Sequence, residues 1–393
     1  MGFKQVLADH KSPALAGVVA SVTGTAASLG IALAALTAVG ATKGQTATSI
    51  VVMVVLYGLL SIVLSWKFKM PISIVWSTPG AAMLIASGTL HFGFAKSVGA
   101  FFVTGLLLLL TGLWPTLGRL VSAIPKPIAS AMLAGVIFSF CVAPFQALPL
   151  YPAIVVPALL VWILLYRFAT VWAAPVAIAV TYTLIAVLMP ADLSHIQMWS
   201  SFDLVFPQFD LTAIVSLAIP LYLVTMASQN VPGIAIMNNF GFTIPFKPVL
   251  MSTGGATMLG SFFGGYSLNL AAITAAINAN EHAHLNPARR WLSSVYGGIA
   301  YLVLAVLAAP TVAFILETPR VLILATSGIA LFGTIGNAIA EATSDIKLRM
   351  PAVVTFLVGA SGIALWGIGA AFWALMSGLA VWGITNLAKK TED

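Results

Sequence analysis

Two short segments combine hydroxyl, amide and glycine residues within an otherwise apolar chain, a mixture suited to holding a small anion. The first, residues 71–84, reads Pro-Ile-Ser-Ile-Val-Trp-Ser-Thr-Pro-Gly-Ala-Ala-Met-Leu, and the second, residues 264–276, reads Gly-Gly-Tyr-Ser-Leu-Asn-Leu-Ala-Ala-Ile-Thr-Ala-Ala. Each begins with residues that favour extended backbone, interrupted by Gly, Pro or Ser, and continues with residues that favour a helix. Because a helix N-terminus carries free N–H groups and partial positive charge, two helix starts that meet would attract a carboxylate.

The candidate ligand groups are the hydroxyls, the amide and the backbone N–H groups at these two helix starts. Trp76 and Phe263 are aromatic residues that can form walls for a ring attached to the carboxylate. The alternative is that the polar residues cap helices and do nothing else, and capping is compatible with binding. The groups are Ser77, Thr78, Gly80 and Ala81 in the first segment, and Tyr266, Ser267 and Asn269 in the second.

Further polar residues lie in two neighbouring apolar stretches. Gln229 and Asn230 are adjacent amides, costly in lipid without partners, so we expect them to face the interrupted segments. The alternative places both amides past a helix end at the cytoplasmic interface. Thr23, Thr25 and Ser28 lie at helical spacing in the first stretch, where they either pack small against another helix or touch the substrate.

Ionisable side chains are scarce in the apolar stretches. Glu281, just after the second segment, is the nearest candidate for a proton carrier, and the alternative is a solvated loop carboxylate. His282 and His284 have no third ligand at suitable spacing, so we expect neither a metal site nor a cofactor.

The composition is that of a membrane protein. Of 393 residues, 60% are hydrophobic and 7% are charged, and the mean hydropathy is +1.06. No soluble fold of this length hides so much apolar surface. The 17 Lys and Arg residues are spread over short loops, where they act as orientation signals and not as a nucleic-acid site.

The chain divides into about fourteen apolar segments. A helix needs roughly 20 residues to cross the hydrocarbon, so the third and tenth segments cross only with help from extended backbone, which is tolerated only inside protein or beside a water-filled cavity. A polar connection at 191–210 separates a first half, 1–190, from a second half, 211–393. The segments centre on 13–36, 47–65, 71–88, 94–114, 126–142, 149–166, 172–190, 211–229, 245–262, 264–280, 291–309, 319–340, 350–365 and 367–387.

The positive-inside rule orients these spans. With both termini in the cytoplasm, all but three of the 17 basic residues lie inside, and Lys43, Lys96 and Arg320 lie outside. Seven spans per half force the second half to be inverted relative to the first. The expected fold class is therefore an all-α polytopic membrane protein of two inverted seven-span repeats, each with a broken third span, which is typical of a transporter.

Four stretches resemble the benzoate:proton symporter (BenE) family, and the resemblance covers essentially the whole chain. They are Trp76–Ala82, Ser228–Gly233, Asn269–Ala276 and Ala283–Trp291. The resemblance implies uptake of benzoate with a proton across the bacterial inner membrane. It also implies a fold similar to that of the uracil permease and the anion exchangers, with a moving core domain and a gate domain. Where a His-containing Phe-Gly-Ala-His-like stretch is expected, this chain has Phe263-Gly264-Gly265-Tyr266-Ser267.

In that fold we expect spans 1–4 and 8–11 to form the core, and spans 5–7 and 12–14 to form the gate. The gate offers an apolar face for lipid or for a homodimer.

Function classes other than a transporter fit the sequence less well. No constellation for an enzyme and no nucleotide-binding motif is present. An anion channel on the same fold, and a transporter of another small anion or a nucleobase, stay open as alternatives. The expected partners are a benzoate-like carboxylate, protons and lipid. The proton would travel either on Glu281 or on the substrate carboxylate itself.

Overall fold

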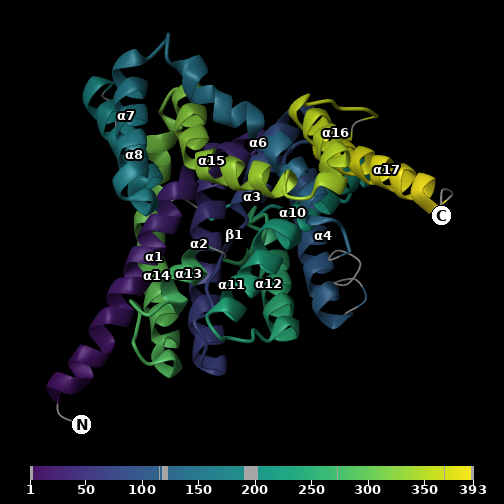
Figure 1. The fold of residues 1–393 in the computed structure, drawn as a ribbon. Helices are drawn as coiled ribbons and strands as arrows, with labels where there is room; N and C mark the ends of the chain where they lie inside the picture. Colours follow the sequence, from purple (N-terminus) through teal and green to yellow (C-terminus); the bar gives the residue numbers. More distant parts are fainter. Residues whose placement is uncertain are drawn as a thin grey trace.

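The chain is almost entirely helical, and a two-stranded ribbon lies at its centre (Figure 1). The computed structural model describes residues 3–114, 116, 123–189, 202–271, 273–366 and 368–390. In the first half the elements are α1 (Phe3–Ala38), α2 (Lys43–Phe68), β1 (Ile74–Trp76), α3 (Thr78–Ala86), the 3-10 turn η1 (Ser87–Leu90), α4 (Phe94–Leu113), α6 (Lys126–Ala147), α7 (Pro152–Phe168) and α8 (Thr170–Leu188). In the second half they are α9 (Leu211–Ala213), η3 (Ile214–Ala218), α10 (Ile219–Thr225), η4 (Met226–Asn230), α11 (Val231–Asn239), α12 (Phe246–Ser261), β2 (Leu268–Leu270), α13 (Ile273–Ala279), η5 (Pro287–Arg289), α14 (Trp291–Leu316), α15 (Arg320–Ala342), η6 (Ile346–Leu348), α16 (Arg349–Ala360) and α17 (Ala370–Lys390).

The helices are those of a multi-pass membrane protein. Within the described residues, seven helices are long and apolar enough to cross a membrane, and three further apolar helices are shorter. Many large apolar side chains on them are exposed in the isolated chain, which is the condition expected where lipid covers the surface.

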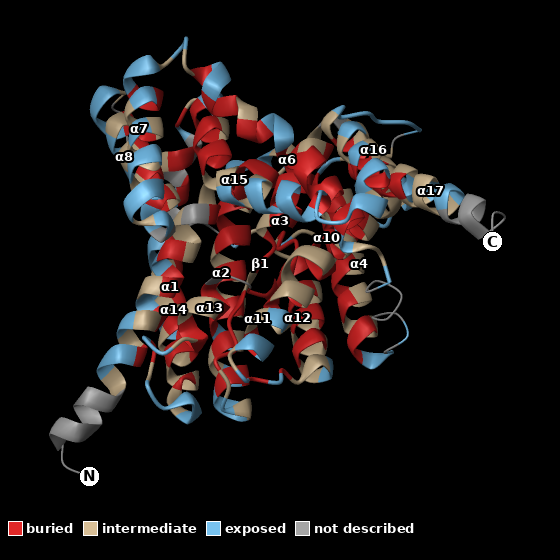
Figure 2. Cartoon of the chain, in the orientation of Figure 1, coloured by how far each residue is buried: buried red, intermediate tan, exposed pale blue. Residues whose placement is uncertain are grey.

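The helices pack in two groups around the ribbon. In one group, α14 lies along α1 and α2, and α12 lies along α4. In the other group, α6 lies along α15 and α16, α16 packs against α17, and α7 packs against α8. The groups touch where α1 meets α15 and α8, and where α3 meets α6. Buried residues gather at the centre, around β1, α3 and α10, and exposed residues cover the outer sides of α7 and α8 (Figure 2).

One long helical stretch, 211–239, contains two π-helical turns, η3 and η4, each directly before a Pro-containing helix. The helix extends beyond the predicted apolar segment 211–229, since it continues to Asn239. Proline lacks an N–H and clashes with the preceding helical turn. The residue directly before each proline donates its N–H to the carbonyl five residues earlier. Ile219 donates to Ile214 O, and Val231 donates to Met226 O. The wider π turns absorb the disruption without ending the helix.

An extended segment, 202–210, crosses the ends of three helices of the first group. Asp203 N–H donates to Thr48 Oγ1 of α2 at 3.3 Å. Val205 N–H donates to Phe262 O at the end of α12 at 2.7 Å, and Gln208 N–H donates to Ala95 O of α4 at 3.0 Å. Residues 191–201 of the predicted polar connection lie outside the described residues.

Candidate functional site

The two interrupted segments meet as an antiparallel ribbon. Neither is a continuous helix, since β1 is followed by α3 and β2 by α13. Beyond the strands, Ser77 N–H donates to Ser267 O at 3.2 Å and Ala271 N–H donates to Ser73 O at 2.9 Å. The ribbon therefore joins the two halves of the sequence by backbone hydrogen bonds. Its register pairs Ile74 with Leu270, Val75 with Asn269 and Trp76 with Leu268.

The free edge of β1 is satisfied by two serines of α2. Ser61 Oγ accepts from Ile74 N–H at 2.9 Å. Ser65 Oγ accepts from Ile72 N–H at 3.1 Å and donates to Ile72 O at 2.8 Å. The two serines are four residues apart, so they lie on one face of α2 and match the alternate N–H groups of an extended strand.

The free edge of β2 is satisfied by a threonine and an amide. Thr257 Oγ1 of α12 accepts from Leu268 N–H at 2.9 Å. Asn230 Oδ1 of η4 accepts from Leu270 N–H at 2.9 Å, and Asn230 Nδ2 donates to Met226 Sδ at 3.3 Å. Asn230 thus faces the interrupted segments, as the sequence predicted, but its oxygen is engaged by the backbone of β2.

Three of the predicted site residues share one face of the ribbon. Alternate residues of a strand point to the same face, and residues opposite one another do so as well. Val75 and Ser77 therefore lie on the same face as Ser267 and Asn269. On this face Ser267 Oγ lies 3.2 Å from Thr225 Oγ1 of α10.

The N-terminus of α3 is capped by Ser77. Its Oγ accepts from Gly80 N–H at 3.1 Å, and its carbonyl accepts from Ala81 N–H at 2.8 Å. The expectation that the Gly80 and Ala81 N–H groups await a ligand is wrong for this conformation, because Ser77 already engages both. A Cβ added at Gly80 would lie 2.8 Å from Ser77 Oγ and 2.5 Å from Leu221 Cδ1, so glycine permits this close cap. The Ser77 hydroxyl accepts from Gly80 and has no acceptor for its own hydrogen among the described residues.

Only one of the two polar atoms of the Asn269 side-chain amide is hydrogen-bonded. Its Nδ2 donates to Leu270 O at 2.8 Å, whereas its Oδ1 is buried and has no partner among the described residues. Burying a polar atom without a partner costs about 1–3 kcal/mol, so each one needs an explanation such as a ligand or water.

Asn269 is one of a group of such atoms. Eight buried side-chain oxygens in the described residues lack a partner, and six of them lie on α1, on the segment of β2 or on α13. α1 and α13 approach closely, since a Cβ on Gly24 would lie 3.0 Å from Thr274 Cγ2. The six belong to Thr23, Thr25, Tyr266, Asn269, Thr274 and Asn278. Thr25 and Thr274 lie within interaction range of the Tyr57 and Tyr301 hydroxyls. The polar atoms that await a partner around the second interrupted segment are therefore those of Thr23, Tyr266, Asn269 and Asn278.

Aromatic side chains pack around the ribbon. The rings of Trp76 and Tyr57 meet edge to face at 5.5 Å, and Trp76 Nε1 donates to Ser28 Oγ of α1 at 2.9 Å. Tyr266 is fully buried and packs against Phe101 of α4, with ring centroids 6.2 Å apart. Ser28 therefore anchors Trp76 rather than standing free for a ligand.

The remaining predicted residues are less central. Thr78 and Gln229 are half-buried at the start of α3 and in η4, respectively. Glu281 is exposed in the turn after α13. The basic loop that follows it is not fully exposed. Arg290 is only 6% exposed and donates from Nη1 to Ala279 O and from Nε to His284 O, both at 2.8 Å. The buried guanidinium satisfies one carbonyl at the end of α13, that of Ala279, and one in the following loop, that of His284.

Comparison with known proteins identifies the family. The sequence model described as "Benzoate membrane transport protein" (BenE) matches residues 8–384. The chain belongs to the BenE family. It is 35% identical over 384 residues to "Inner membrane protein YdcO" of Escherichia coli (strain K12), covering 95% of both chains. It is 30% identical over 322 residues to a "Benzoate membrane transport protein" of Acinetobacter baylyi, covering 81% of both chains.

Solved structures share the fold of this BenE member at low sequence identity. The transmembrane domain of a cyanobacterial bicarbonate transporter, BicA, has a TM-score of 0.63 at 17% identity, over 95% of this chain and 98% of that one. SLC26A9 has a TM-score of 0.63 at 14% identity, over 98% of this chain and 66% of that one. The murine Slc26a9 anion transporter, in the inward-facing state, gives 0.59 at 15% identity. The protein is therefore a membrane transporter, not an enzyme, with the fold of these anion transporters.

Several residues of the site carried little or no signal that set them apart in the sequence. Ser61, Ser65 and Thr257 support the strand edges, yet an isolated hydroxyl in an apolar helix usually bonds to its own backbone. Only the four-residue spacing of the two serines, facing a predicted strand, hinted at a shared partner. The contact of Thr225 with Ser267 likewise could not be predicted without the register of β2.

Asn230→Leu tests whether this amide supports the ribbon. Leucine is similar in size but leaves the Leu270 N–H buried and unsatisfied, which costs about 1–3 kcal/mol. We expect a lower thermal unfolding midpoint in lipid nanodiscs than for wild type. Asn238→Leu, the same change at an exposed position of α11, is the matched control and should leave the midpoint nearly unchanged. An unaltered midpoint in Asn230→Leu would show that the β2 edge does not depend on this side chain.

Proposed function

We propose that this protein is a secondary active transporter that imports benzoate, or a similar aromatic carboxylate, together with a proton by alternating access. The observation that carries the proposal is the buried Asn269 Oδ1 without a partner, on the same ribbon face as Ser77 and Ser267. The substrate carboxyl group binds at this face, beside the N-terminus of α3. The names of the BenE relatives support the substrate class.

The hydrogen-bonding pattern fits a protonated carboxyl group. An unpartnered amide oxygen is an acceptor, and a carboxylate has no hydrogen to give it. A neutral carboxylic acid donates its O–H to Asn269 Oδ1 and accepts from the Ser77 hydroxyl, whose hydrogen has no acceptor among the described residues. The neutral form also avoids the large cost of an unpaired charge at a buried site.

Proton coupling then needs no buried carboxylate. Glu281 is exposed in the turn after α13, where water solvates its charge. We propose that the substrate itself carries the proton: the neutral acid leaves the site and releases the proton when it ionises in the cytoplasm. Glu281 as a cytoplasmic proton acceptor is the alternative route.

Alternating access rests on two moving parts. The helices that pack around α14 and α12 form the core domain together with the ribbon, and those around α6, α7 and α16 form the gate domain. The antiparallel pairing of β1 with β2, each followed by a short helix, is what two inverted seven-span repeats require. The distribution of basic residues supports cytoplasmic termini and fourteen spans.

Asn269→Leu tests the substrate site. It removes the amide at similar size, and losing a hydrogen bond to the neutral carboxyl group should weaken binding of labelled benzoate about two- to tenfold. The readout is equilibrium binding to protein in nanodiscs, with Asn238→Leu as the matched control. Wild-type affinity in Asn269→Leu would remove this residue from the site.

Glu281→Gln tests the proton route in proteoliposomes. If the substrate carries the proton, the variant still exchanges labelled benzoate and still accumulates it against an imposed pH gradient. A variant that exchanges benzoate but no longer accumulates it would contradict the substrate-borne route and assign coupling to Glu281. Because both outcomes require exchange, exchange also serves as the folding control.

A further inference from the structure

A cavity lies at the C-terminal end of α3, away from the ribbon. It has a volume of about 180 Å³ and lies between the C-terminal end of α1, η1, the turn into α4 and Leu217 of η3. The nine residues of α3 connect it to the ribbon, a distance of about 14 Å at 1.5 Å per residue. Because sites for drug-sized ligands run from about 300 Å³ upward, this cavity suits a small, one-ring ligand.

The cavity wall is built by residues with unusual backbone conformations. His91 has φ 49°, in the left-handed region, and Gly93 and Gly40 have φ 83° and 99°. The left-handed region is uncommon for a residue with a side chain and costs roughly 1–2 kcal/mol. A Cβ added at Gly93 would meet nothing within 4 Å, so the space beside it is open.

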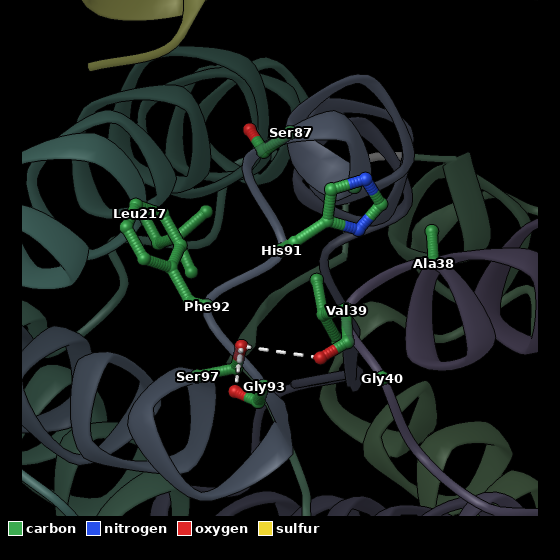
Figure 3. Close-up of a pocket in the computed structure, with 10 residues that line it drawn as sticks. Ala38, Val39, Gly40, Ser87, His91, Phe92, Gly93, Ser97 and Leu217 are labelled. Atoms are coloured by element: carbon green, nitrogen blue, oxygen red, sulfur yellow. Dashed lines mark hydrogen bonds between the residues drawn. The ribbon is translucent and has the colours of Figure 1, made fainter. Parts of the chain in front are cut away.

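The lining offers one side chain suited to an anion. Ser87 Oγ already donates to Met83 O at 3.0 Å, and Ser97 Oγ is bonded to Gly93 O at 3.1 Å. The ring of His91 supplies an N–H donor. Figure 3 shows the His91 ring on one side of the cavity and the ring of Phe92 beside Leu217 on another.

The neighbouring charges do not oppose an anion. None of the residues that line the cavity is acidic. The nearby carboxylate of Asp210 is paired with Lys96 at 3.0 Å. The pKa of Asp210 lies below its usual value because Ala213 N–H and the Lys96 ammonium donate to it.

We propose that this cavity is a vestibular site that receives the ionised aromatic carboxylate before it reaches the ribbon, with the carboxylate on His91 and the ring against Phe92 and Leu217. The proposal rests on the substrate class and orientation proposed above, under which this end of α3 faces outward. A carboxylate that accepts from an imidazole N–H forms a charge-assisted hydrogen bond. In this cavity the ligand is bound as the hydrated anion. It gives up its contact with water when it moves to the ribbon as the neutral acid.

The cavity lies beside a contact with the proposed gate domain. A Cβ on Gly369, just before α17, would lie 3.4 Å from Leu90 Cδ1 and 3.6 Å from Ser87 Oγ. A ligand beside Ser87 therefore sits next to a contact between the two groups of helices, where its presence can affect their relative movement.

The test is fluorine NMR of 4-fluorobenzoate with the full chain in nanodiscs. Wild type should show two bound environments. His91→Gly removes the ring, and glycine accepts the left-handed backbone, so one environment should vanish, while the one that depends on Asn269 remains and reports correct folding. His91→Asn keeps an N–H donor in a residue that tolerates this conformation and should retain both. In proteoliposomes, His91→Gly should raise the KM for influx about tenfold with little change in kcat.

Two results would overturn the vestibular site: a single bound environment in wild type, or two unchanged environments in His91→Gly. Failure of the proposed function looks different. In that case no bound environment responds to Asn269→Leu, whatever happens at His91.

Discussion

The structure depends on one constraint: backbone N–H and C=O groups cannot be left unpaired at membrane depth. Two interrupted spans would each expose such groups. Here they pair with one another through β1 and β2, and their outer edges are closed by Ser61 and Ser65 on one side and by Thr257 and Asn230 on the other. The ribbon is therefore supported along both edges, and it ties together elements more than 190 residues apart in the sequence.

The same arrangement explains why polar groups remain for a substrate. Once the backbone of the ribbon is satisfied internally, the side chains of its polar face need partners of their own. Ser267 finds Thr225, whereas the Asn269 oxygen finds none among the described residues. A transporter needs such a site, because the substrate must bind transiently and its departure must not disrupt the scaffold. The ribbon separates these tasks, with structural hydrogen bonds at its edges and ligand groups on its face.

The positions of the two interrupted segments could be predicted from the sequence, whereas the residues that hydrogen-bond to them could not. Gly, Pro and Ser within short apolar segments marked 71–84 and 264–276, because such residues punctuate helices through local chemistry. The role of Asn230 could not be assigned, since its partner, Leu270 N–H, is 40 residues away and identified only by register. The predicted segment 211–229 is shorter than the helix, because a π turn before Pro232 lets the helix continue to Asn239. The burial of Arg290 was not predicted, because its contact with the Ala279 carbonyl depends on how α13 ends in space.

The central claim is that the substrate carboxyl group binds on the ribbon face beside Ser77 and Asn269. The most direct measurement is a cryo-electron microscopy or crystal structure of the chain with 4-iodobenzoate, whose iodine marks the ligand unambiguously. The account predicts a carboxyl group within hydrogen-bonding distance of Asn269 Oδ1 and the Ser77 hydroxyl, with β1 and β2 still paired. Ligand density elsewhere with the ribbon face empty, or a continuous helix through residues 71–88, would contradict it.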